Sequence, residues 1–141
     1  MIYSGLIRKL GWLIVLSPSL SSAQGGDGPS VVNWSCMDVA VSGLRWNQDT
    51  ETYRDESFFM QQHRVQQKKD QLIFPAAMGF REGYSCGFRP NIPVLSCDDG
   101  VYRFNLNVQT GYATHSKGYG WMDPYGRPEP MFVAASVCRQ Q

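Results

Sequence analysis

The chain has 141 residues, of which 43% are hydrophobic, 13% aromatic and 18% charged. This composition is typical of one globular domain and excludes a disordered or collagen-like chain. The formal net charge of +1 lacks the basic excess of nucleic-acid-binding proteins, so we expect no nucleic-acid partner.

The N-terminal segment has the pattern of an export signal. Two basic residues precede the apolar run Leu10–Leu16, and Pro18 follows it. Ser21 and Ala23 match the small residues that precede a signal-peptidase cleavage site. The run is shorter than the roughly 18 apolar residues of a membrane span, and a short buried helix is the alternative interpretation. We predict a signal peptide over residues 1–23, cleaved near Ala23, no membrane span, and a periplasmic or secreted protein.

The rest of the chain divides into an arm and one domain. Residues 24–30 read QGGDGPS, which predicts a flexible N-terminal arm. Residues 31–141 contain short apolar segments with turn signals between them and predict a single β domain.

The expected strands are Val39–Arg45, Thr52–Arg54, Phe58–Val65, Leu72–Phe74, Val101–Val108, Tyr112–His115 and Met131–Val137. The expected turns are Asn47–Thr50, Lys68–Gln71, Asp98–Gly100 and Gln109–Gly111. Gly118–Trp121 reads as a short strand or a loop. A helix over Glu56–Gln67 is the main alternative, but its apolar residues follow the 3.6-residue period poorly. We therefore predict an all-β fold, an antiparallel meander of about six to eight strands that forms a small barrel or a sandwich.

The 4 cysteines all follow the predicted signal peptide. An even number in an exported chain indicates disulfides, and the sequence leaves three pairings open. We favour Cys86 with Cys97, closing a short loop, and Cys36 with Cys138, joining the ends of the domain. There is no C-x-x-C motif, and both histidines lie far from every cysteine in sequence, so we expect no metal and no cofactor.

Three aromatic residues are candidates for ligand binding at the mouth of a barrel: Trp46, Phe104 and Trp121. The alternative is that these side chains fill the core.

The 2 histidines, His63 and His115, are the candidate general bases. The polar neighbours of His63 favour a solvated face. Ser116 follows His115 directly, and adjacent residues of a strand point to opposite faces, so Ser116 is not placed as its nucleophile. The adjacent Asp98 and Asp99 are explained by the turn that Gly100 completes. No residue pattern therefore indicates a catalytic site.

Two resemblances accompany these patterns. Gly43–Asp49, of sequence GLRWNQD, resembles the first strand and turn of avidin-like and lipocalin-like barrels, although two residues rather than one separate Gly43 from Trp46. The layout of an early W-x-C, a central C-D-D-G, a G-Y-G-W segment and a late cysteine is similar to small exported bacterial β-proteins of unassigned function. These resemblances imply a β fold and no particular activity.

The sequence thus predicts a non-enzymatic exported domain that binds a small ligand or an extracytoplasmic protein. One alternative is a small secreted hydrolase that uses His63 or His115. Another is an inhibitor whose loop at Arg89–Pro93, held by Cys86 and Cys97, enters the cleft of a target enzyme.

Overall fold

A computed structural model describes residues 30–118 and 128–141 of the chain. Its strands are β1 (Val31–Asn47), β2 (Thr52–Glu56), β3 (Gln62–Lys68), β4 (Gln71–Ile73), β5 (Ser85–Phe88), β6 (Val94–Asp98), β7 (Tyr102–Asn107), β8 (Tyr112–Lys117) and β9 (Met131–Gln140). A 3-10 turn, η1 (Ala76–Met78), lies between β4 and β5. The predicted signal peptide, nearly all of the predicted arm and Trp121 lie outside the described residues.

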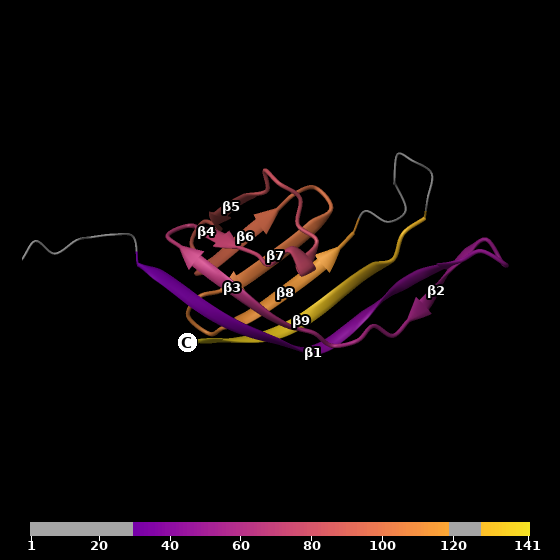
Figure 1. Ribbon diagram of the computed structural model, residues 1–141, viewed down its shortest axis with the longest axis horizontal. Helices are drawn as coiled ribbons and strands as arrows, with labels where there is room; N and C mark the ends of the chain where they lie inside the picture. The colour runs from indigo at the N-terminus through magenta and orange to yellow at the C-terminus, as the bar shows by residue number, and fades with distance from the viewer. Residues whose placement is uncertain (1–29, 119–127) are drawn as a thin grey trace, which may run out of the picture.

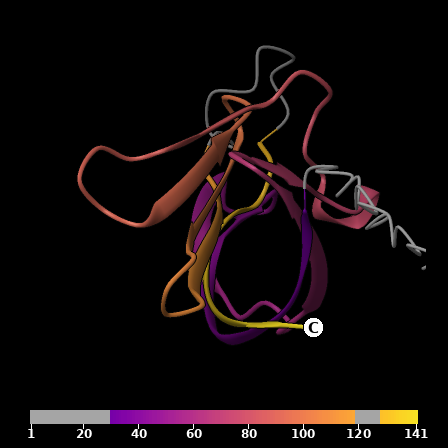
Figure 2. The ribbon, with the colours of Figure 1, turned by 90° about the vertical axis from the view of Figure 1, so that its left-hand side faces the viewer.

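The strands form one antiparallel sheet that is nearly closed into a barrel (Figure 1). Their order is β4-β3-β1-β9-β8-β7-β6-β5, and β2 pairs separately with β1. Strands β5 to β9 follow each other as a meander, whereas β1 lies between β3 and β9. The first and last described strands are therefore neighbours, and Figure 2 shows the curved sheet from its end. The all-β fold class predicted from the sequence is confirmed.

Strand β1 is the longest and organises the sheet. One edge pairs with β9, while the other edge pairs first with β3 and then, at its far end, with β2. A bulge interrupts the β1–β9 register between Asp38 and Ala40. Opposite it, the segment 57–61 links β2 to β3, and the Asp38 amide donates to the Gln61 carbonyl at 2.9 Å. The bulge thus lies where the pairing on the other edge of β1 changes from β3 to β2.

The interior is filled by alternating inward side chains. Phe104, Leu72, Leu95, Leu106 and Val65 are completely or almost completely buried. Burial of each such side chain contributes about 1.5–3 kcal/mol relative to exposure. These apolar side chains pack against one another across the curved sheet and fill the centre of the barrel.

Two disulfides join directly opposite residues of neighbouring strands. Cys36 pairs with Cys138 between β1 and β9, closing a sequence separation of 102 residues. Cys86 pairs with Cys97 between β5 and β6, with a separation of 11 residues. The structure therefore has the pairing that the sequence analysis favoured.

Several differences from the expected strands have local causes. The sheet has nine strands, because Ser85–Phe88 and Val94–Asp98 form a hairpin around the second disulfide. Strand β3 begins at Gln62, so the predicted strand from Phe58 starts four residues later in the chain. No helix forms over residues 56–67. In the predicted turns, the Asn47 and Asp99 side chains accept backbone N–H bonds from the residues that follow them, as turn chemistry requires.

Candidate functional site

The structure does not bring the aromatic residues predicted to bind a ligand into one site, because the two that it describes have different neighbours. Phe104 is 0% exposed, and its ring packs on Phe74 at 5.3 Å between centroids. Trp46, at the far end of β1, packs edge-on against Tyr53 at 5.2 Å. Trp121 is outside the described residues. Neither pocket described below is lined by Trp46 or Phe104, and their binding role stays a prediction.

The structure buries both histidines, which corrects the expected solvated face for His63. His63 is 5% exposed and His115 is 4% exposed. Alternation explains this, because His63 and Val65 share the inward face of β3 while the polar neighbours point outward. Burial is the largest cause that lowers the pKa of both imidazoles, and that of His115 falls to about 4.

Four polar residues meet inside the barrel and form what we call the interior polar cluster: Asp38, His63, His115 and Ser136. The Ser136 hydroxyl donates to Asp38 Oδ1 at 2.7 Å. The Gln61 amide donates to Asp38 Oδ2 at 3.0 Å. The two imidazole rings meet edge to face with centroids 5.8 Å apart, and the Nε2 atoms of both are buried without a hydrogen-bond partner among the described residues. The Asp38 charge partly offsets the lowering of both pKa values.

The geometry of this cluster does not support nucleophilic catalysis. A serine hydrolase needs the serine hydroxyl on an imidazole that can take its proton. Here the Ser136 hydroxyl is directed to the Asp38 carboxylate instead, and Ser136 is only 3% exposed. Within residues 30–118 and 128–141, no group of three or more potential ligand side chains could hold a metal ion.

Sequence reasoning missed Asp38 and Ser136 as members of one cluster. The available signal was parity along each strand, since Asp38 shares a face with Cys36 and Ser136 shares one with Cys138. With the cysteines paired, both polar side chains would point to the same interior.

A small opening, the aromatic pocket, lies beside this cluster. Its volume is about 50 Å³, and its lining residues are Asp38, Val41, Phe58, Phe59, Gln61, His115, Phe132 and Ala134. The centroid of the Phe132 ring lies 5.8 Å from the centroid of the Phe58 ring and 5.1 Å from that of the His115 ring. Phe59 is 93% exposed, so the pocket meets solvent at the segment 57–61. It combines one carboxylate and one imidazole with phenyl walls.

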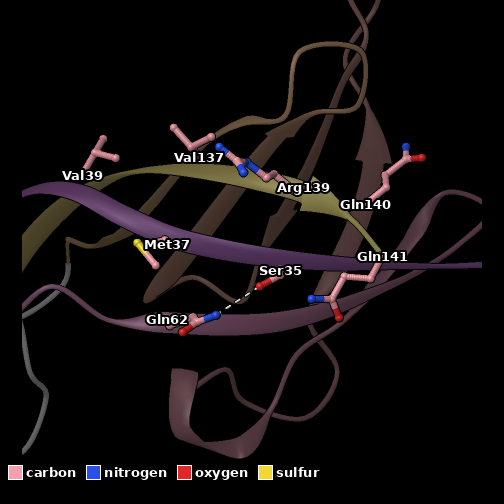
Figure 3. Close-up of a pocket in the computed structure, with 8 residues that line it drawn as sticks. All are labelled: Ser35, Met37, Val39, Gln62, Val137, Arg139, Gln140 and Gln141. Carbon is pink, nitrogen blue, oxygen red and sulfur yellow. Dashed lines mark hydrogen bonds between the residues drawn. The ribbon is translucent and has the colours of Figure 1, made fainter.

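A larger hollow, the outer groove, lies on the opposite, solvent-facing side of β1, β3 and β9. Its volume is about 610 Å³, and Figure 3 shows its lining residues: Ser35, Met37, Val39, Gln62, Val137, Arg139, Gln140 and Gln141. Met37 is 55% exposed and Val39 is 58% exposed. The Gln62 side chain donates to the Ser35 hydroxyl at 3.2 Å. Arg139 is the one charged residue among the described residues of this lining.

The apolar surface of the outer groove continues across the sheet. Met37 lies opposite Val137 in the β1–β9 register, and Val137 lies opposite Tyr112 in the β8–β9 register. Tyr112 is 66% exposed, and Val133, further along β9, is 58% exposed. The middle of the sheet thus presents a row of apolar side chains to solvent, in which Val137 is half-buried and the others are exposed.

The disulfide-held hairpin of β5 and β6 carries the loop that suggested an inhibitor. Arg89 begins the loop, and its side chain donates to Asn105 Oδ1 on β7 at 3.2 Å. Its backbone amide bonds to the Val94 carbonyl at 2.8 Å, closing the hairpin. Ile92 at the tip is 48% exposed. The Arg89 side chain is thus bonded to the domain while the loop stays exposed, and the inhibitor role remains a prediction.

Comparisons with protein-family models, curated protein sequences and solved structures found no match to this chain. Among the residues that the structure describes, no helix has the length and apolar character needed to cross a membrane. The disulfides are of the kind found in extracytoplasmic compartments.

Proposed function

We propose that this chain is an exported, non-enzymatic β domain that binds an extracytoplasmic protein partner through the outer groove. The signal-like segment over residues 1–23, with cleavage near Ala23, supports export. Two disulfides support an oxidising destination. The packed interior argues against a large ligand at the centre of the barrel, because Phe104, Leu95 and Leu106 occupy that space.

The observation that carries this proposal is the row of exposed apolar side chains in the middle of the sheet. Soluble domains rarely expose contiguous apolar surface, and where they do, it commonly serves binding. Met37, Val39 and Val137 border a groove rather than a flat face, which gives a partner's side chains a place to insert. Arginine is also enriched in protein interfaces, and Arg139 lies at the edge of this surface.

The lining defines the chemistry of the partner. Its apolar residues call for aliphatic or aromatic side chains, and Arg139 calls for a carboxylate that can pair with the guanidinium in a bidentate manner. Gln62 and Ser35 offer an amide and a hydroxyl for a polar rim. The expected partner therefore presents apolar residues next to Asp or Glu.

A selection from random displayed peptides tests the proposal on the oxidised protein. We expect enriched peptides to combine apolar residues with Asp or Glu. Met37→Asp and Arg139→Glu should weaken binding of these peptides about tenfold or more, the effect of one interface anchor. Arg54→Glu is the matched control, because Arg54 is exposed on β2 and does not line the groove.

Two results would overturn the proposal. One is that peptides without carboxylates are enriched and bind both groove variants as well as the unaltered protein. The other is a concentration-dependent dimer in sedimentation that Met37→Asp abolishes, since the occupant would then be a second copy of this chain.

The export part has its own test in the intact mass of the protein recovered outside the cytoplasm. A mass of residues 24–141 less the hydrogens lost in two disulfides is expected. A full-length, reduced protein would refute the proposed destination.

A further inference from the structure

We propose that the aromatic pocket binds a primary ammonium group, such as the end of an alkylamine or of a lysine side chain. This site is separate from the outer groove, and the inference goes beyond the proposed function. It rests on a buried carboxylate, a buried nitrogen without a partner, and phenyl walls that open to solvent.

The carboxylate is Asp38, which lines the pocket and is 5% exposed. The two donors that reach it, the Ser136 hydroxyl and the Gln61 amide, are both neutral. No ion pair to Asp38 is formed by the residues that the structure describes. A carboxylate has about four acceptor positions, so two donors leave it able to accept more. Buried charges are usually paired, and a cation in the pocket would supply the missing partner.

The unpartnered nitrogen is Nε2 of His115, which also lines the pocket. Burial lowers the pKa of His115 to about 4, so the imidazole is neutral at neutral pH. In the tautomer with the proton on Nδ1, Nε2 accepts a hydrogen bond. An ammonium group has three N–H donors, so one bound to Asp38 keeps donors for a second acceptor at the pocket.

The phenyl walls suit the same ligand. Phe58 and Phe132 offer ring faces, and cations bind favourably over such faces within about 6 Å of the centroid. The Arg45 guanidinium lies 5.5 Å from the centroid of the Phe58 ring, so a bound cation would share this ring with Arg45, whereas Phe132 offers a second ring. Phe59, 93% exposed, borders the way in from solvent.

Other ligand classes fit less well. Asp38 would repel an anion, and a purely apolar ligand would leave Asp38 and His115 Nε2 without a partner. The described residues offer no group of three metal ligands. The pocket, at about 50 Å³, is far smaller than the outer groove, at about 610 Å³, so it suits a compact head group.

Titration of the oxidised protein with n-butylammonium, followed by NMR at neutral pH, tests the inference. We expect saturable shifts in the resonances of His115 and Phe132. The neutral n-butanol and the anionic butyrate should produce no such shifts. In Asp38→Asn the ammonium affinity should fall about tenfold or more, the value of one charge-assisted hydrogen bond.

A second variant keeps the test independent of the hydrogen bonds that Asp38 makes within the fold. Phe58→Leu retains these bonds and removes a ring face, and it should weaken ammonium binding while Met37→Asp in the outer groove leaves it unchanged. The inference is overturned if butanol shifts the same resonances as well as the ammonium does. It is equally overturned if no saturation occurs, or if both Asp38→Asn and Phe58→Leu bind the ammonium normally. The groove is tested with displayed peptides and the pocket with n-butylammonium. A negative result at one site therefore does not affect the interpretation of the other.

Discussion

Acidification should destabilise this protein through its two buried imidazoles. The unfolded chain binds a proton at each histidine near pH 6.5, whereas burial lowers the pKa of both in the folded state, that of His115 to about 4. Above pH 6.5 both states are neutral there, and the histidines leave stability unaffected. As the pH falls below 6.5, the unfolded state takes up protons that the folded state refuses, so the free energy of unfolding falls.

The size of the effect follows from the shift at His115. Each pKa unit corresponds to about 1.4 kcal/mol, so this group alone removes about 3 kcal/mol of stability between pH 6.5 and 4. His63 acts in the same direction.

Asp98 titrates in a different pH range. Its pKa is lowered first by the Gly100 amide and also by Arg103, so its contribution is present above pH 3.8 and is lost below that value.

Urea denaturation at a series of pH values from 7 to 4.5, with the disulfides intact, measures the slope. The chain has only 2 histidines, so the variant His63→Phe/His115→Phe removes every imidazole and is the matched control. We expect a steep loss of stability in the unaltered protein and a much flatter profile in the variant. A flat profile in the unaltered protein, or equal slopes in both, would refute the assignment to these residues.

Two further predictions concern stability at neutral pH. Replacing both cysteines of the β1–β9 disulfide by Ala should lower the free energy of unfolding by about 5 kcal/mol in the chain-entropy model, against about 3 kcal/mol for the β5–β6 disulfide, because the closed loops span 102 and 11 residues. Urea midpoints compare the two, and a larger loss from the short loop would contradict this model here. Gly43→Ala should destabilise by about 2 kcal/mol, since its Cβ would meet the Met131 carbonyl and lie 2.6 Å from the Phe58 ring. Gly87→Ala is the control, with no atom within 4 Å of the added Cβ, and an equal loss in both would contradict the steric explanation.

Much of the local structure could be predicted from the sequence because its causes are local. Turns at Asn47 and Asp99 form through side chains that bond backbone amides two or three residues away. Alternation over Val101–Val108 indicated β7 for the same reason, since period-two patterns need no distant partner.

The arrangement of the sheet and the candidate sites depend on long-range pairing that such patterns do not encode. The bond between Ser136 and Asp38 joins residues 98 positions apart, and only the β1–β9 register brings them together. The burial of His63 could be predicted from strand parity, because Val65 lies on the same face of β3. The polar residues at 61, 62 and 64 indicated a solvated face instead, although 62 and 64 point to the opposite side of the strand. The outer groove could not be predicted, because its residues come from three strands that are distant in the chain.

The place of β1 between β3 and β9 has a consequence for how the fold is reached during synthesis. A growing chain emerges N-terminus first, so β1 is made long before β9. Until β9 exists, the whole β9-facing edge of β1 has unpaired amides and carbonyls, a template for pairing with other chains. Cys36 likewise cannot form its disulfide until Cys138 has been synthesised, whereas Cys86 and Cys97 can form theirs earlier. Completion of the barrel and protection from mispairing therefore both depend on the arrival of the last described strand.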